Sequence, residues 1–167
     1  MQTFSKVSVI GLGYIGLPTA AMLASRKLRV IGVDVNQHAV DTINQGKIHI
    51  VEPELDLLVH AAVTGGYLSA QTNPVAADAF MIAVPTPFFD DLSPDLTYVE
   101  AAVKSIAPVL AKGNLVVLES TSPVGTTEKI CQWISEARPD LTVPTDSSQP
   151  DIHVAYCPER VLPGRVV

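Results

Sequence analysis

The sequence is poor in charged residues, aromatic residues and cysteine, and these shortages exclude several classes of protein. Charged residues make up 17% of the 167 residues and aromatic residues 5%, whereas hydrophobic residues make up 47%. Disordered chains are polar and strongly charged, so this aliphatic composition indicates one folded domain with a sizeable core. The net charge is −6 and the sequence has no run of Lys and Arg, which argues against a nucleic-acid partner.

The chain has two cysteines, Cys131 and Cys157, too few for a disulfide framework and without zinc-ligand spacing. We expect both to be small buried apolar side chains in a reducing compartment, and hence a cytoplasmic protein. The four histidines also lack metal-ligand spacing, so no metal site is predicted.

Uninterrupted hydrophobic runs are missing as well. The largely apolar residues 7–24 follow Lys6 and superficially resemble a signal peptide or a membrane span. Three glycines, Ser8 and Pro18 interrupt this run, and no other segment could span a bilayer. We therefore expect neither a targeting segment nor a membrane partner.

A glycine-rich turn explains the same segment better. A strand is predicted over residues 7–10 and a helix over residues 17–26, and Gly11, Gly13 and Gly16 lie between them. In a dinucleotide site the first glycine allows a tight turn, the second lets the backbone approach a pyrophosphate, and the third lets helix and strand pack closely. The phosphates then lie at a helix N-terminus, which attracts anions. The alternative is a glycine turn that only aids packing.

Asp34 indicates which dinucleotide binds. It follows a strand predicted over residues 30–33, where a carboxylate can accept hydrogen bonds from the ribose hydroxyls. Residues 35–40 contain no Arg or Lys to hold a 2′-phosphate, which favours NAD over NADP. An N-cap role for Asp34 is the alternative, but Asn36 is better placed to cap the helix predicted over residues 38–44.

Apolar segments continue to alternate between strand and helix patterns along the chain. The pattern predicts a Rossmann-like, doubly wound α/β fold with a parallel sheet and helices on both faces. Residues 139–150, rich in Pro, Ser, Thr and Asp, are predicted to form an exposed loop. The remaining predictions are helices over residues 55–63, 98–110 and 127–137, and strands over residues 68–71, 79–84, 115–118 and 153–156.

Polar segments directly follow three of the predicted buried strands, at residues 85–87, 120–123 and 158–160. In open parallel sheets, ligands bind outside the carboxyl ends of the strands. We therefore expect these three loops to converge with the glycine turn on one site. Ordinary strand-ending turns would explain one such loop well but three of them poorly.

Taken together, the motifs resemble the UDP-glucose/GDP-mannose dehydrogenase family of nucleotide-sugar 6-dehydrogenases. The resemblance covers nearly the whole chain and implies that residues 1–167 form an N-terminal NAD-binding domain. It also implies that the family's dimerisation helix, its C-terminal sugar-nucleotide domain, its nucleophilic cysteine and its catalytic lysine lie beyond Val167. The matching motifs are Gly11-Leu-Gly-Tyr-Ile-Gly16, Asp34, Gly46 with Glu52-Pro53, Val84-Pro-Thr-Pro87, Ser120-Thr-Ser-Pro-Val-Gly125 and Pro158-Glu-Arg160.

Family members oxidise the C6 alcohol of a nucleotide sugar to a carboxylate in two hydride transfers to NAD, through intermediates bound to cysteine. The resemblance therefore implies NAD as cofactor, a UDP-sugar as substrate and a homodimeric parent enzyme that serves cell-surface polysaccharide synthesis. The segment alone is expected to be inactive.

The resemblance also assigns roles to individual residues. Thr121 would lie beside the reacting centre, and Glu159 would orient or activate the hydrolytic water. Arg160 and Val161 would contact the nucleotide sugar. Besides the three glycines, the residues expected to contact NAD are Tyr14, Ile15, Asp34, Thr86 and Thr127.

Within the family, residues 157–164 are similar to the branch that oxidises UDP-N-acetyl-D-mannosamine. Arg160 stands where the glucose branch tends to carry Phe, and Pro163 stands in place of that branch's second Glu. The alternatives are an enzyme for UDP-GlcNAc or UDP-glucose, and a standalone NAD-binding sensor module. Ala39 is a departure, because the family usually has Lys or Arg there, which puts one supporting phosphate contact in doubt.

Overall fold

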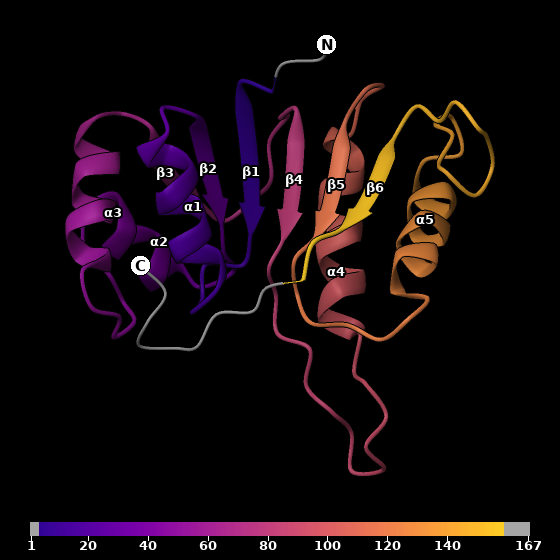
Figure 1. Ribbon diagram of the computed structural model, residues 1–167, viewed down its shortest axis with the longest axis horizontal. Helices are drawn as coiled ribbons and strands as arrows, with labels where there is room; N and C mark the ends of the chain where they lie inside the picture. The colour runs from indigo at the N-terminus through magenta and orange to yellow at the C-terminus, as the bar shows by residue number, and fades with distance from the viewer. Residues whose placement is uncertain (1–3, 159–167) are drawn as a thin grey trace.

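A computed structural model describes residues 4–158 and contains one six-stranded sheet in which every strand pair is parallel (Figure 1). The strand order is β3-β2-β1-β4-β5-β6. The strands are β1 (Lys6–Ile10), β2 (Arg29–Val33), β3 (Leu68–Gln71), β4 (Ala79–Ile82), β5 (Leu115–Leu118) and β6 (His153–Tyr156), and the helices are α1 (Gly16–Ser25), α2 (Gln37–Asn44), α3 (Leu55–Thr64), α4 (Thr97–Ile106), the 3-10 turn η1 (Ala107–Val109) and α5 (Thr126–Ala137).

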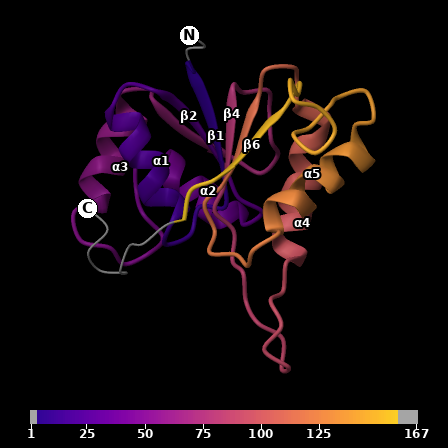
Figure 2. The same ribbon diagram turned by 45° about the vertical axis from the view of Figure 1, so that its right-hand side comes forward.

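Helices cover both faces of the sheet, as Figure 2 shows, with α1 and α3 on one side and α4 and α5 on the other. Two clusters of buried apolar side chains correspond to these layers, one including Leu17, Leu55 and Val59, the other including Phe80, Val103 and Ile130. The predicted doubly wound α/β fold is thus confirmed. The strand order reverses between β1 and β4, which is where such folds bind ligands.

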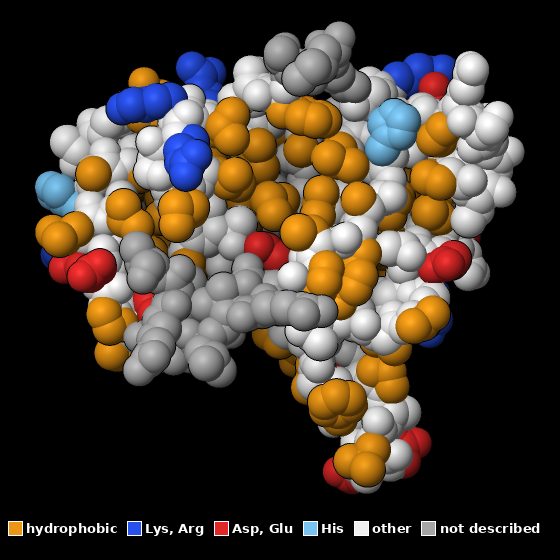
Figure 3. All heavy atoms as spheres, viewed as in Figure 1, with side chains coloured by type: hydrophobic (Ala, Val, Ile, Leu, Met, Phe, Trp, Pro, Cys, Tyr) orange, Lys and Arg blue, Asp and Glu red, His pale blue; other side chains and the backbone are white. Residues whose placement is uncertain are grey.

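The face of the sheet that carries α1 and α3 is less completely covered over β4 and β5. Met81, Leu115 and Val117 are half-buried on these strands. Figure 3 shows hydrophobic side chains gathered on this face of the molecule.

The segment between β4 and α4 forms an arm that extends past the carboxyl edge of the sheet (Figures 1 and 2). Backbone hydrogen bonds join Phe89 N–H to the Ser93 carbonyl and Asp95 N–H to the Pro87 carbonyl, each 2.8–2.9 Å long. The arm is therefore internally hydrogen-bonded, and Phe88 and Leu92 are exposed on it.

Three predicted elements differ from the structure by more than one residue. The strand predicted over residues 79–84 ends at Ile82. The helix predicted over residues 98–110 ends as an α-helix at Ile106 and continues as η1. Pro108 explains the change, because proline has no N–H to continue the helical hydrogen bonds. The loop at residues 139–150 was predicted to be exposed, which is wrong at Leu141 and Val143, since both are buried against the core beneath α4 and α5.

Asp78, in the segment before β4, holds the start of β1 in place. Its Oδ2 accepts hydrogen bonds from the backbone N–H of Ser5 (2.8 Å), the hydroxyl of Ser5 (2.9 Å) and the backbone N–H of Lys6 (2.9 Å). These bonds favour the charged form, and they hold the pKa of the Asp78 carboxyl below its ordinary value.

The lowered pKa of Asp78 makes stability depend on pH. Because the folded pKa lies below the unfolded pKa of about 4, the contribution is fully present above the unfolded pKa and is lost as the pH falls through the folded pKa. We expect Asp78→Asn to lower the free energy of unfolding at neutral pH by about 1 kcal/mol, a small value because solvent screens this carboxylate. Urea unfolding of wild type and variant, from neutral into acid solution, should show the difference disappearing. A difference that persists in acid, or an equal loss in Asp90→Asn, would contradict this account.

Candidate functional site

The turn between β1 and α1 can accept only glycine at two positions. Gly11 has a φ of +91°, and a Cβ there would lie 2.6 Å from the Ala83 carbonyl oxygen. A Cβ on Gly16, where α1 begins, would lie 1.8 Å from the Gly11 carbonyl oxygen. Backbone atoms therefore lie too close for any side chain, and this close packing fixes the direction in which α1 leaves the sheet.

Gly13 is different, because a Cβ there would meet no atom within 4 Å. The protein itself does not demand glycine at this position, and the open space would let a ligand reach the backbone. Tyr14 follows and is 47% exposed, and Ile15 is the half-buried N-cap residue of α1. Within the described residues no side chain caps this helix and its first turn has no acidic residue, so the N-terminus is suited to an anion.

Asp34 is tied to the glycine turn by its side chain. Its Oδ2 accepts a hydrogen bond from the Leu12 backbone N–H (2.8 Å), and its Oδ1 accepts one from the Asn36 backbone N–H (2.9 Å). The helix cap belongs to Asn36, as predicted, since its Oδ1 accepts from the N–H groups of His38 and Ala39. Each carboxylate oxygen of Asp34 can accept a further hydrogen bond, so the carboxylate can still accept hydrogen bonds from ribose hydroxyls.

The loops after β4 and β5 are bonded to each other, which brings together two of the predicted site residues. The Thr86 hydroxyl donates to the Thr121 carbonyl oxygen (2.7 Å), and the Ser120 hydroxyl donates to the Val84 carbonyl oxygen (2.7 Å). Thr121 itself is exposed at the carboxyl edge of the sheet. Thr86 and Thr121 therefore lie in one bonded unit at the edge where ligands of this fold bind.

The prediction from sequence missed Glu119, the residue directly after β5. Its side chain is 5% exposed, and its Oε1 accepts a hydrogen bond from the Thr19 hydroxyl of α1 (2.8 Å). An acidic residue that ends a buried strand was the available signal, as it was for Asp34.

Thr127 lines a pocket of about 240 Å³ at the N-terminus of α5, together with Tyr156. The Thr127 hydroxyl donates to Glu128 Oε2 (2.8 Å). The other residues that line this pocket are Leu118, Ser122, Pro123, Val124, Gly125, Thr126 and Glu128. The pocket does not include the glycine turn, so the structure does not place Thr127 with Gly13 and Asp34.

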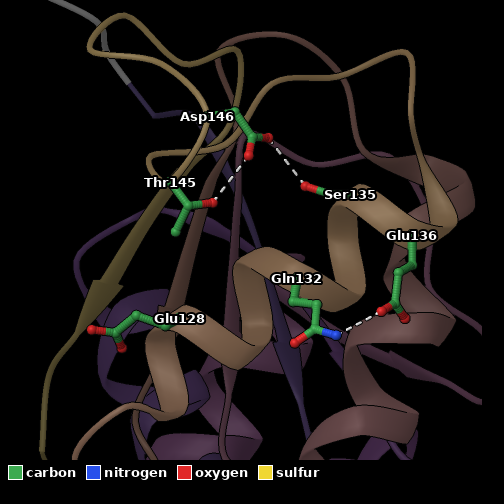
Figure 4. A pocket seen from close by; sticks show the side chains of 6 residues that line it. All are labelled: Glu128, Gln132, Ser135, Glu136, Thr145 and Asp146. Carbon is green, nitrogen blue, oxygen red and sulfur yellow. Dashed lines mark hydrogen bonds between the residues drawn. The ribbon is translucent and has the colours of Figure 1, made fainter.

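A larger pocket of about 460 Å³ lies on the outer side of α5 (Figure 4). The hydroxyls of Ser135 and Thr145 each donate to a carboxylate oxygen of Asp146 (3.2 Å), and Glu128 and Glu136 also line the space. Three carboxylates disfavour a dinucleotide pyrophosphate, and none of the predicted site residues within residues 4–158 lines this pocket. We therefore do not assign the dinucleotide to it.

Glu159, Arg160 and Val161, predicted to act on the hydrolytic water and the nucleotide sugar, lie outside the described residues. Their roles stay predictions.

The two cysteines differ in exposure, so the expectation that both are buried is wrong for Cys157. Cys131 is buried in α5, whereas Cys157 is exposed just past the end of β6, an edge strand. Burial raises the pKa of the Cys131 thiol above its ordinary value.

The thiols should therefore react at very different rates. Because the thiolate is the reactive form, Cys131 should resist alkylation in the folded protein while Cys157 is labelled. Mass spectrometry of iodoacetamide-treated protein should find one label under native conditions and two in denaturant. Native labelling of a Cys157→Ser variant at the rate of wild type would contradict this prediction.

The parallel sheet, the glycine turn and the carboxylate at the end of β2 define a dinucleotide-binding domain of the Rossmann class. Residues 5–167 match the model of the UDP-glucose/GDP-mannose dehydrogenase family, NAD binding domain, and the chain belongs to this family. Its cofactor is NAD.

Named relatives match nearly the whole of this chain. The chain is 68% identical over 167 residues to the UDP-N-acetyl-D-mannosamine dehydrogenase of Yersinia pestis. This match covers 99% of the chain and 40% of the relative. The chain is 67% identical over 165 residues to the NDP-N-acetyl-D-galactosaminuronic acid dehydrogenase of Ralstonia nicotianae, covering 98% and 39%. The solved structure of the UDP-N-acetyl-mannosamine dehydrogenase Cap5O from S. aureus superposes with a TM-score of 0.88 at 42% identity, covering 97% of this chain and 38% of that one. The chain thus spans about 40% of the length of the curated relatives it matches.

None of the helices in residues 4–158 is long and apolar enough to cross a membrane.

Proposed function

We propose that the chain is the NAD-binding part of a UDP-N-acetyl-D-mannosamine 6-dehydrogenase, which oxidises the sugar C6 alcohol to the uronic acid for cell-surface polysaccharide synthesis. The observation that carries the proposal is the bond between Asp34 Oδ2 and the Leu12 N–H, which sets a ribose-binding carboxylate against a phosphate-binding turn. The similarity to UDP-N-acetyl-D-mannosamine dehydrogenases supports the choice of sugar. When bound, NAD supplies the hydride acceptor.

In this proposal, residues at the carboxyl edge of the sheet contact different parts of the cofactor and the substrate. The N–H groups at the start of α1, beside Gly13, Tyr14 and Ile15, hold the pyrophosphate, and Asp34 holds the ribose. Thr86 and Thr127 contact the rest of the cofactor, and Thr121 lies beside the reacting centre. Glu159 positions the hydrolytic water, and Arg160 and Val161 contact the nucleotide sugar.

We further propose that residues 1–167 alone bind NAD without oxidising a sugar. Covalent catalysis requires its nucleophile and its acid and base groups in one site. In the family these groups come from segments that follow this domain. The whole enzyme would act as a cytoplasmic homodimer.

An N-acetylgalactosamine nucleotide sugar is a specific alternative substrate, because the NDP-N-acetyl-D-galactosaminuronic acid dehydrogenase is 67% identical to the chain, almost as similar as the 68% relative. UDP-GlcNAc and UDP-glucose are further candidate substrates.

The test has two parts. Calorimetric titration of residues 1–167 with NAD and NADP should show selective binding of NAD. The protein from the complete reading frame should then be assayed with UDP-ManNAc, UDP-GalNAc, UDP-GlcNAc and UDP-glucose by the absorbance of NADH. The proposal expects the highest kcat/KM with UDP-ManNAc and two NADH formed per sugar. Preference for another sugar would overturn the choice of substrate, and NAD binding without any sugar oxidation would favour a sensor module.

A further inference from the structure

Glu119 is a buried carboxyl group to which the proposed function gives no role. It is 5% exposed, and its backbone N–H donates to the carbonyl oxygen of Ile82 in β4 (2.9 Å). Its Oε1 accepts the hydroxyl hydrogen bond of Thr19 (2.8 Å), a residue 100 positions away in α1. Burying a carboxyl group costs free energy that an apolar side chain would not, so what the carboxyl adds here is a directed bond between β5 and α1.

The two sides of this bond belong to different parts of the candidate site. Thr19 lies in the first turns of α1, the helix whose N-terminus carries the phosphate-binding glycine turn. On the other side, Glu119 is followed directly by Ser120 and Thr121. The Ser120 hydroxyl donates to the Val84 carbonyl oxygen, and the Thr121 carbonyl oxygen accepts from the Thr86 hydroxyl. These two bonds join the loops after β4 and β5. A displacement of α1 along its axis therefore acts directly on the backbone that carries Thr121.

We propose that Glu119 is a positioning residue that couples α1 to residues 120–125, so that NAD held at the N-terminus of α1 orders the loop that carries Thr121. The inference rests on the proposed function for NAD binding at the glycine turn. Its physical basis is the hydrogen bond between the Thr19 hydroxyl and the Glu119 side chain, which ties α1 to the residue directly before Ser120 and Thr121. Bound NAD then makes the loop that carries Thr121 open less often.

Amide hydrogen exchange of the chain, with and without saturating NAD, tests this coupling without any need for sugar oxidation. In wild type, NAD should slow exchange in residues 120–125 about tenfold or more. Thr19→Ala and Glu119→Leu remove the two sides of the bond, so each should bind NAD within about threefold of wild type but lose the slowing. Glu119→Gln should retain it, because its amide oxygen can accept the Thr19 hydroxyl.

Thr42→Ala is the matched control, since the Thr42 hydroxyl donates its hydrogen bond (2.7 Å) to the His38 backbone carbonyl oxygen within the same helix, α2. This variant should keep the NAD response of wild type. If Thr19→Ala does not fold, the isosteric Thr19→Val replaces it and removes the same donor.

Each contrary outcome has a definite meaning. Slowing that persists in Thr19→Ala and Glu119→Leu overturns the coupling, even where the melting temperature falls, because the bond would then be only structural. Wild type that binds NAD without slowed exchange in residues 120–125 also overturns the coupling and leaves the proposed function standing. Wild type that is folded and binds no NAD overturns both.

Discussion

Replacing Gly16 with alanine is expected to destabilise the domain by about 3 kcal/mol or more and to abolish NAD binding. The added Cβ would lie 1.8 Å from the Gly11 carbonyl oxygen and 3.1 Å from the Cβ of Ala83. The first contact is with backbone, which cannot move aside like a flexible side chain, so α1 or the turn itself must shift. Urea unfolding and calorimetric titration with NAD measure the two effects.

Gly13→Ala separates folding from binding in the same turn. A Cβ at this position meets no protein atom within 4 Å, so the free energy of unfolding should change by less than about 1 kcal/mol. The methyl group would, however, occupy the space through which the pyrophosphate approaches the backbone, and NAD affinity should fall about tenfold or more. Wild-type stability in Gly16→Ala would refute the packing argument, and wild-type NAD affinity in Gly13→Ala would refute the role of Gly13 in binding.

Replacing Asp34 with alanine is expected to lower NAD affinity about 100-fold. The variant loses the carboxylate proposed to accept the ribose hydroxyls, and each hydrogen bond to a charged group contributes about 1.5 to 3 kcal/mol. It also leaves the Leu12 N–H without the acceptor that holds the glycine turn against β2. The affinity for NADP should fall less, because the carboxylate that repels a 2′-phosphate is gone. Calorimetric titration with both dinucleotides gives the ratio of the NAD affinity to the NADP affinity.

Asp41→Ala is the control for this experiment. Asp41 is an exposed aspartate on the neighbouring helix α2, where it accepts a hydrogen bond from the Gln37 side chain (2.8 Å). This variant has the same change in net charge and should bind NAD as wild type does. Equal NAD affinity in Asp34→Ala and Asp41→Ala would show that the carboxylate at the end of β2 does not hold the cofactor.

Much of the fold could be predicted because its signals are local. The strands at residues 68–71, 115–118 and 153–156 were predicted with the bounds that the structure has, since each is a short segment bounded by turn-forming residues. The close packing at Gly11 and Gly16 was also predictable, because a bonded strand, turn and helix leave few alternatives to glycine. The local pattern predicted a helix to residue 110, but the α-helix ends at Ile106, just before Pro108.

Features that depend on contacts distant in sequence could not be predicted. The burial of Glu119 depends on Thr19, 100 positions earlier, and no periodicity reports such a pair. The exposure of Cys157 follows from the place of β6 at the edge of the sheet, which only the strand order reveals. The burial of Leu141 and Val143 depends on how the loop after α5 folds back over the core.

The two hydrogen bonds of Asp34 have a consequence for how quickly the cofactor binds. Both carboxylate oxygens are already oriented by backbone N–H groups of the protein, so the Asp34 side chain does not have to change its rotamer when a dinucleotide binds. The entropy of ordering this side chain is lost during folding rather than during association, which leaves more of the contact energy available for affinity. The proposed ribose site at Asp34 is therefore preorganised, and we expect binding there to proceed without a slow rearrangement of the turn.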